Sequence, residues 1–187
     1  METIKFDRKV KCGFEFVALR MLDSCDNIKI GDVYVPNTTA TNMRLGFYII
    51  EDIGSKAAEE TGLVIGDYVL ADRLSSFAHT EPVCLMKYDN LICKTDKDRT
   101  DFWPLRNRVF VDLDKTDEVS NIGGVYVKNY TAKMQTGTVV KTNVDEDMEL
   151  PFEVGDKVML VKGGDCVQMG SKTFYIYKPD MLICKFL

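Results

Sequence analysis

The sequence has few of the residues from which most catalytic and metal-binding sites are built. Its 187 residues include one histidine, His79, and its six cysteines form no C-x-x-C pair. Zinc sites usually draw closely spaced ligands from these residue types, so we expect no metal centre. The chain also has no G-x-S-x-G motif and no glycine-rich phosphate loop. These absences predict no catalytic residues, no cofactor and no enzymatic activity.

Clustered positive charge and long apolar runs are also missing. The formal net charge is −5 and the isoelectric point is near 5.0, whereas a nucleic-acid surface needs clustered lysine and arginine. No run approaches the ~20 apolar residues that a membrane span requires. The segment Met1–Lys9 has no apolar stretch typical of a signal peptide. We therefore expect a cytoplasmic protein that binds neither nucleic acid nor membrane.

What the sequence does have is an internal repeat. The segment Asn121–Asn129, NIGGVYVKN, has a near-copy in Lys29–Asn37, KIGDVYVPN. A Gly-Asp turn and the tetrapeptide Leu-Ile-Cys-Lys then recur in the same order, the latter as Leu91–Lys94 and Leu182–Lys185. A repeat of this length indicates a duplicated domain whose insertions and deletions fall in surface loops.

The repeat predicts a first domain over residues 1–95, a linker over 96–103 and a second domain over 104–187. Each half has fewer than about 100 residues and so buries only a thin core. Contacts between domains or between subunits would add to that core. We therefore expect a homo-oligomer.

Short alternating segments predict an all-β fold. Arg108–Leu113 and Lys157–Val161 have the composition and spacing of strands, and Thr173–Tyr177 is expected to pair with Met181–Phe186 as a hairpin. The only helix candidate is Ser55–Glu60. Short strands separated by turns and long loops favour one β-barrel in each half.

The cysteines are expected to be reduced thiols, because nothing in the sequence indicates an oxidising compartment. Cys93 and Cys184 occupy equivalent positions in the two copies of Leu-Ile-Cys-Lys. A free cysteine in an apolar run behaves as a small buried hydrophobic residue. We therefore expect both of these thiols to be buried.

The second half resembles the GroES co-chaperonin family over essentially its whole length. The matching segments, in order, are Pro104–Val111, Gly123–Val127, Thr136–Val140, Val154–Val158 and Asp180–Ile183. The first half resembles the family through the repeat, but it lacks the Pro-Leu-Arg opening and has Gly31-Asp32 where Gly-Gly is expected. The resemblance therefore implies two GroES-like β-barrels in tandem.

The resemblance also implies a function. Members of this family form a ring that caps a GroEL-type chaperonin in its ATP-bound state, and they dock through a flexible loop with an apolar tripeptide. The residues that would bind the chaperonin here are Gly123, Gly124, Val125, Tyr126, Val127, Val33, Tyr34 and Val35. The central tyrosine departs from the usual aliphatic residue. In an extended peptide the outer two side chains face one way and the central one faces the other, so both valines could still enter a groove.

Two alternatives remain at this point. Valine and tyrosine are good strand formers, so Val-Tyr-Val could be an ordinary barrel strand. The chain could also be a structural protein, for example a virion component, that uses paired barrels without a chaperonin. Tandem barrels occur in plastid co-chaperonins and divergent forms occur in phages. The absence of a transit peptide favours a bacterial or phage source, and for a phage protein the compartment would be the host cytoplasm.

The resemblance leaves open how many chains form the ring, because the expected chaperonin partner has sevenfold symmetry. No whole number of two-barrel chains supplies seven barrels in one layer. Closed rings repeat equivalent contacts around an axis. Either seven chains stack their barrels in two tiers, or fewer chains place both halves in one layer.

Overall fold

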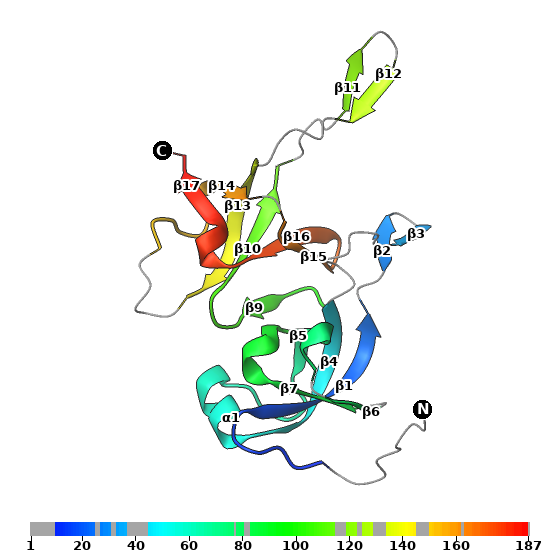
Figure 1. The fold of residues 1–187 in the computed structure, drawn as a ribbon, viewed down its shortest axis with the longest axis vertical. Coiled ribbons are helices and arrows are strands. Elements are labelled where there is room, and N and C mark those ends of the chain that lie inside the picture. The colour runs from blue at the N-terminus through cyan, green and yellow to red at the C-terminus, as the bar shows by residue number, and fades with distance from the viewer. Residues whose placement is uncertain are drawn as a thin grey trace.

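The chain folds into two large antiparallel sheets, one from each half (Figure 1). The structure is a computed structural model. It describes residues 10–24, 27–30, 33–36, 45–76, 78–80, 83–114, 119–122, 125–128, 134–144, 150–161 and 163–186.

The first half contains most of the helical residues. Its strands are β1 (Phe16–Ser24), β2 (Asn27–Ile30), β3 (Val33–Pro36), β4 (Leu45–Ile53), β5 (Tyr68–Asp72), β6 (Ala78–Thr80), β7 (Val83–Lys87), β8 (Leu91–Thr95) and β9 (Phe102–Pro104). Its helices are α1 (Ser55–Thr61) and the 3₁₀ turns η2 (Arg73–Ser75) and η3 (Tyr88–Asn90). The helix predicted at Ser55–Glu60 is therefore confirmed by α1.

Among its described residues, the second half contains strands and one 3₁₀ turn. Its elements are β10 (Arg108–Leu113), β11 (Val119–Ile122), β12 (Val125–Lys128), β13 (Met134–Asn143), β14 (Lys157–Val161), β15 (Asp165–Met169), β16 (Lys172–Tyr177), η4 (Pro179–Met181) and β17 (Leu182–Lys185). Among the described residues no helix is long and apolar enough to cross a membrane.

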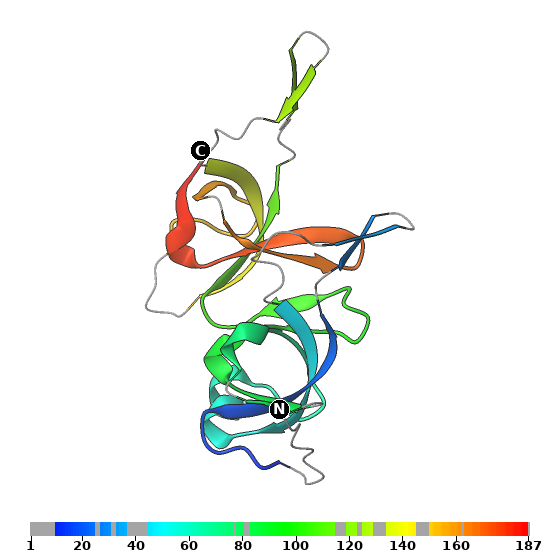
Figure 2. The same cartoon turned by 45° about the vertical axis from the view of Figure 1, so that its right-hand side comes forward.

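The two sheets have the same strand order. The first runs β6-β7-β1-β4-β5-β8-β9 and the second runs β15-β16-β10-β13-β14-β17. Apart from β9, each strand of the first sheet corresponds to one strand of the second. The prediction of an all-β chain with two barrels of one type is confirmed, and Figure 2 shows that both sheets are strongly curled.

The correspondence extends to hydrogen bonds in the Gly-Asp turns. Gly66 and Gly155 have φ of 92° and 99°, values that glycine adopts without strain. Gly66 N donates to Ile50 O over 2.9 Å, and Gly155 N donates to Val139 O over 2.8 Å. The repeat read from the sequence thus specifies the same turn twice.

One predicted strand pairing is wrong. Thr173–Tyr177 lies in β16, which pairs with β10 and β15, whereas β17 pairs with β14. The turn η4 separates the two strands, with Pro179 at its start. Proline lacks a backbone N–H and favours such a turn, and here the chain crosses to the other end of the sheet instead of folding back.

A common hydrophobic cluster joins the two halves. Its ring centroids lie close together: Phe102 is 4.5 Å from Phe110 and 5.2 Å from Phe174. We call this cluster the junction core; its buried members are Leu45, Phe47, Leu70, Ile92, Cys93, Phe102, Phe110, Val167, Met169, Phe174 and Ile176. Both halves contribute, so the two sheets share apolar burial.

The residues predicted as a linker, 96–103, form a tight turn followed by β9. Asp96 accepts hydrogen bonds from the backbone N–H groups of Thr100 (2.7 Å) and Asp101 (2.9 Å). β9 then pairs with β8 of the first sheet, and Lys141 of β13 donates to Phe102 O over 2.7 Å. This segment therefore contacts both halves through regular structure.

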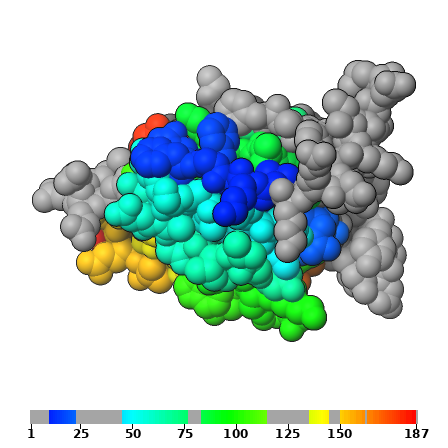
Figure 3. All heavy atoms as spheres, turned by 90° about the horizontal axis from the view of Figure 1, so that it is seen from below, coloured from blue at the N-terminus to red at the C-terminus, as the bar shows by residue number. Residues whose placement is uncertain are grey.

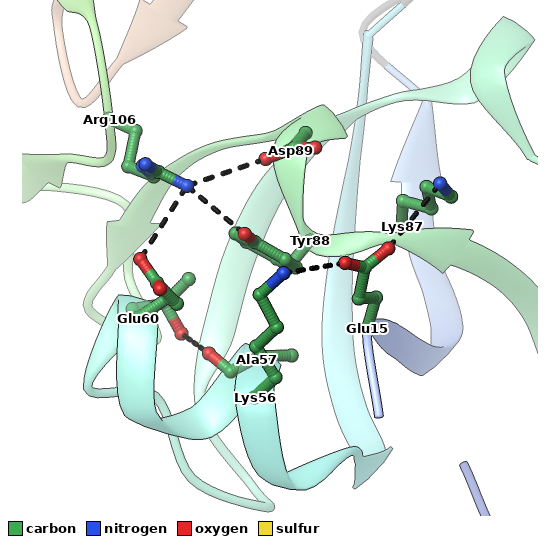
Figure 4. Close-up of polar contacts among 9 residues, drawn as sticks. Glu15, Lys56, Ala57, Glu60, Lys87, Tyr88, Asp89 and Arg106 are labelled. Atoms are coloured by element: carbon green, nitrogen blue, oxygen red, sulfur yellow. Dashed lines mark hydrogen bonds and ion pairs between the residues drawn. The ribbon is translucent and has the colours of Figure 1, made fainter. Parts of the chain in front are cut away.

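Polar contacts at Arg106 add to the junction (Figure 4). Its Nη1 donates to the Tyr88 hydroxyl over 3.1 Å and lies 3.6 Å from a Glu60 oxygen and 3.7 Å from an Asp89 oxygen. Arg106 follows β9, whereas Glu60 belongs to α1 and both Tyr88 and Asp89 belong to η3. Seen from below, the face consists mainly of first-half residues, with the second half at its margin (Figure 3). The halves thus lie end to end.

Candidate docking hairpins

Each predicted docking tripeptide lies in a hairpin outside the large sheets. β2 pairs with β3, and β11 pairs with β12, as separate two-stranded sheets. Figure 1 shows β11 and β12 extending beyond the sheet of the second half, and Figure 2 shows β2 and β3 projecting sideways. The two hairpins occupy the same place in the repeat, between β1 and β4 and between β10 and β13.

The backbone of both tripeptides is extended. Val33, Tyr34 and Val35 lie in β3, and the second-half tripeptide, Val125–Val127, lies in β12. Gly123 and Gly124, which were also predicted to bind the chaperonin, lie outside the described residues. Among the described strands, β3 and β12 pair only with their hairpin partners. Neither tripeptide is therefore a strand of the large sheets.

The hairpins have nearly the same cross-strand register. Ile30 faces Val33 in the first, and Ile122 faces Val125 in the second. A lone two-stranded hairpin is marginally stable in water. A partner that binds such a hairpin can therefore provide much of its order.

The second hairpin is connected to its sheet through a closed base. Asp114 N donates to Thr136 O over 2.9 Å, and the Thr136 hydroxyl donates to Asp114 Oδ2 over 2.5 Å. The Lys157 ammonium lies 3.1 Å from the same carboxylate oxygen. The Thr136 hydroxyl, and then Lys157, hold the pKa of Asp114 below its usual value. A charged residue thus joins the two strands at the point where the hairpin segment leaves the sheet.

Glycines close both bases. Gly137 pairs with Leu113 at the end of β10, and Gly46 pairs with Ser24 at the end of β1. A Cβ atom at Gly137 would lie 2.5 Å from a Val111 methyl group and 2.7 Å from Asp112 O. The strands can approach this closely only because the residue has no side chain.

Sequence reasoning missed the residues that form this base. Asp114 directly follows the predicted strand Arg108–Leu113, and no pattern in the sequence links it to Thr136 or Lys157. The aligned glycines, Gly46 and Gly137, were visible as matching positions in the repeat. Each stands near the start of a β-rich segment, and this shared position is the signal for the two bases.

The described residues contain no group of three or more histidine, cysteine, aspartate or glutamate side chains that could hold a metal ion. Cys84, Cys93 and Cys166 are buried free thiols, and burial raises the pKa of Cys84 to about 11. The prediction that Cys184 is buried is wrong, because this thiol is exposed. The reason lies in the edge position of β17, which no described strand covers.

Comparison with known families places a match on the second half. Residues 101–186 match the family model described as "Chaperonin 10 Kd subunit". The match extends from β9 to β17 and includes the β11–β12 hairpin and its base. A search of curated proteins found no match. The family match supports the GroES-like character predicted for this half, and with it a co-chaperonin type of function in general terms.

Proposed function

We propose that this chain is a co-chaperonin that caps a GroEL-type chaperonin ring in its ATP-bound state and assists protein folding. The observation that carries the proposal is the position of Val-Tyr-Val in each half, on a hairpin outside both large sheets. The family match over residues 101–186 supports it. The proposed compartment is the cytoplasm, or the host cytoplasm for a phage protein.

The proposal includes a homo-oligomeric ring, for an energetic reason. Burying one valine side chain contributes on the order of 1.5–3 kcal/mol. Ordering a flexible segment costs about 1–2 kcal/mol per residue. One hairpin alone therefore binds weakly. Several hairpins on one assembly act at a high effective concentration and bind tightly while each contact stays releasable.

We further propose that the two halves arose by tandem duplication and that the chain performs no chemistry of its own. The matched strand orders and Gly-Asp turns support the duplication. In this proposal the chaperonin, and not this chain, hydrolyses ATP. The chain then needs a docking surface and a stable scaffold, and it needs no catalytic group.

The test is capture of the chain by a GroEL-type chaperonin with and without ATP. We expect capture to require ATP and to be lost when Val125 and Val127 are both changed to serine. The corresponding change at Val33 and Val35 should weaken capture less, because the first half lacks part of the family pattern. Val154→Ser is the matched control and should be captured like the wild type, since Val154 is an exposed valine of the Gly-Asp turn, outside both hairpins.

Circular dichroism and thermal unfolding must show that each variant keeps the wild-type fold. Equal capture of the wild type and the doubly substituted Val125/Val127 variant would contradict docking through this hairpin. Failure of the folded wild type to be captured in any nucleotide state would instead favour a structural protein that uses paired barrels.

A further inference from the structure

A pocket of about 360 Å³ lies between the two halves, and we call it the junction pocket. Asp72 at the end of β5 and Ile92 of β8 line it from the first half. Arg108 at the start of β10 and Ile176 of β16 line it from the second half. Ligand sites usually span about 300–1,000 Å³. The junction pocket therefore suits a small molecule, and neither half forms it alone.

Arg108 carries a charge that the protein only partly satisfies. Its Nη1 donates to Asn107 O over 3.1 Å, whereas a guanidinium has five N–H donors. Within the part of the chain that the structure describes, Arg108 forms no ion pair. Burial lowers the pKa of Arg108, and the charges of Asp165 and Asp72 act in the opposite direction. A partly desolvated guanidinium with unused donors is a favourable partner for a carboxylate of a ligand.

The internal repeat shows that the barrel does not require this charge. β1 begins at Phe16 and β10 begins at Arg108. Each next residue, Val17 or Val109, pairs with the residue that stands five places before Leu-Ile-Cys-Lys. Phe16 and Arg108 therefore occupy the same position in the two barrels. Because an aromatic residue serves in the first barrel, the arginine has a role other than forming the strand.

A second cation lines the junction pocket for a related reason. Lys87 and Lys178 match in the repeat, since each stands four residues before Leu-Ile-Cys-Lys. The Lys87 ammonium lies 3.4 Å from a carboxylate oxygen of Glu15. Asn107 replaces Glu15 in the second half, and no described carboxylate forms an ion pair with Lys178. Lys178 is exposed and lines the pocket, so it adds a second positive charge.

Two carboxylates, Asp72 and Asp165, balance these cations in the lining. Asp72 accepts from Leu74 N over 3.0 Å and from the Ser75 hydroxyl over 3.1 Å. A carboxylate offers about four lone-pair sites, so Asp72 can accept from a further donor. A simple anion would be repelled by the carboxylates, and a simple cation would be repelled by the arginine and lysine. A ligand with one charge of each sign matches this lining.

The remaining lining is an apolar wall, formed by Ile92, Ile176, Met181 and the ring of Tyr177. The Tyr177 hydroxyl already bonds Gln135 Oε1 over 3.3 Å, so the ring contributes an apolar surface. A Cβ atom at Gly164 would lie 2.5 Å from this ring, so glycine allows the ring to pack against the backbone. An aliphatic side chain fits such a wall.

We propose that the junction pocket binds a free aliphatic α-amino acid, such as leucine, as a zwitterion. Its carboxylate binds Arg108 and Lys178. Its ammonium group faces Asp72 and Asp165, and its side chain contacts the apolar wall. Because these groups come from both halves, the bound amino acid stabilises the folded chain at the junction.

The first experiment is calorimetric titration of the purified full-length wild type with L-leucine and two analogues. Leucine amide keeps the ammonium group and lacks the carboxylate, whereas N-acetylleucine keeps the carboxylate and lacks the ammonium group. We expect each analogue to bind at least about tenfold more weakly than leucine, because each loses a charge-assisted contact. Equal binding of either analogue would overturn the zwitterion proposal. Failure of the folded wild type to bind leucine, isoleucine or valine would also overturn it.

The second experiment changes Arg108 in the same full-length chain. R108M keeps much of the side-chain length and removes the charge. R106M is the matched control, because Arg106 is a nearby arginine outside the lining. We expect leucine to bind R106M like the wild type and R108M at least about tenfold more weakly.

Thermal unfolding without ligand shows whether both variants fold. Leucine should then raise the Tm of the wild type and R106M, and it should leave the Tm of R108M unchanged. Wild-type affinity in folded R108M would contradict the proposal. If R108M does not fold, the two analogues still decide the question on the wild type. No measurement here involves a chaperonin, so this proposal and the proposed function can fail separately.

Discussion

At the scale of single residues, Asp114 determines how the base of the second hairpin responds to pH. Its carboxylate accepts from the Thr136 hydroxyl and lies beside Lys157, so its pKa is lowered in the folded chain. A lowered folded pKa stabilises the fold at pH values above the unfolded pKa, about 3.9 for aspartate, and that stabilisation is lost as the pH falls through the folded value.

We therefore predict that D114N lowers the free energy of unfolding at neutral pH and that its difference from the wild type shrinks below about pH 4. Urea unfolding at a series of pH values measures this. D112N is the matched control, because Asp112 is an exposed aspartate near the end of β10, two residues before Asp114. A D114N difference that stays constant down to pH 2 would show that the charge of Asp114 is not the cause.

The cysteines show what a local pattern can and cannot predict about a residue. The sequence correctly predicted Cys93 to be buried and incorrectly predicted the same for Cys184. Both lie in Leu-Ile-Cys-Lys, so no local property distinguishes them. Burial depends on the next strand in space, and β9 provides that strand for only one of the two.

At the scale of elements, the matching strands β8 and β17 allow the same substitution to be compared in a buried and in an exposed position. Ile92 is buried in the junction core, whereas Ile183 is half exposed. We predict that I92A costs about 2–5 kcal/mol of folding stability, as for other buried Ile-to-Ala changes. I183A should cost less than about 1 kcal/mol in the isolated chain, because the site is open to water.

Chemical denaturation at concentrations where the chain is monomeric compares the two variants. Similar losses in both would mean that Ile183 is covered within the single chain, which would contradict its exposure at the edge of β17. A large loss in I92A alone would support the difference between the two strand edges.

The sequence predicted most strands but not all of their partners. Arg108–Leu113 and Lys157–Val161 coincide with β10 and β14, because alternating apolar residues and a preceding turn define a strand locally. The pairing of β17 with β14 depends on how η4 redirects the chain. The sequence did not predict the two hairpins. A loop that contains Val-Tyr-Val and a hairpin that contains it have the same sequence pattern, and they differ only in whether a second strand pairs with the tripeptide.

At the scale of the whole molecule, the junction core indicates that the two halves are stabilised together. Phe102 packs against Phe110 and Phe174 across the boundary between the halves. By comparison, Arg106 is 39% exposed and its carboxylate partners are similarly open or more so. Exposed ion pairs contribute about 0–1 kcal/mol, whereas truncating a buried phenylalanine costs about 3–5 kcal/mol. Apolar packing thus dominates the junction.

We predict that F102A loses about 3–5 kcal/mol of stability and R106A about 1 kcal/mol or less. The wild type should unfold in a single transition, because both halves lose the junction core at once. Scanning calorimetry of the three chains tests this. Two separate transitions in the wild type, with F102A shifting only one of them, would mean that the halves are stabilised independently.

The number of chains in the assembly follows from how the barrels are joined. Since the junction core holds the two halves of each chain end to end, a ring that keeps one kind of junction between barrels places both halves in one layer. The numbers of chains nearest to seven barrels are then three and four. We therefore predict that native mass spectrometry finds three or four copies of the 21.2-kDa chain. Seven copies would support two tiers, with one half of each chain facing the chaperonin. That result would contradict a single layer.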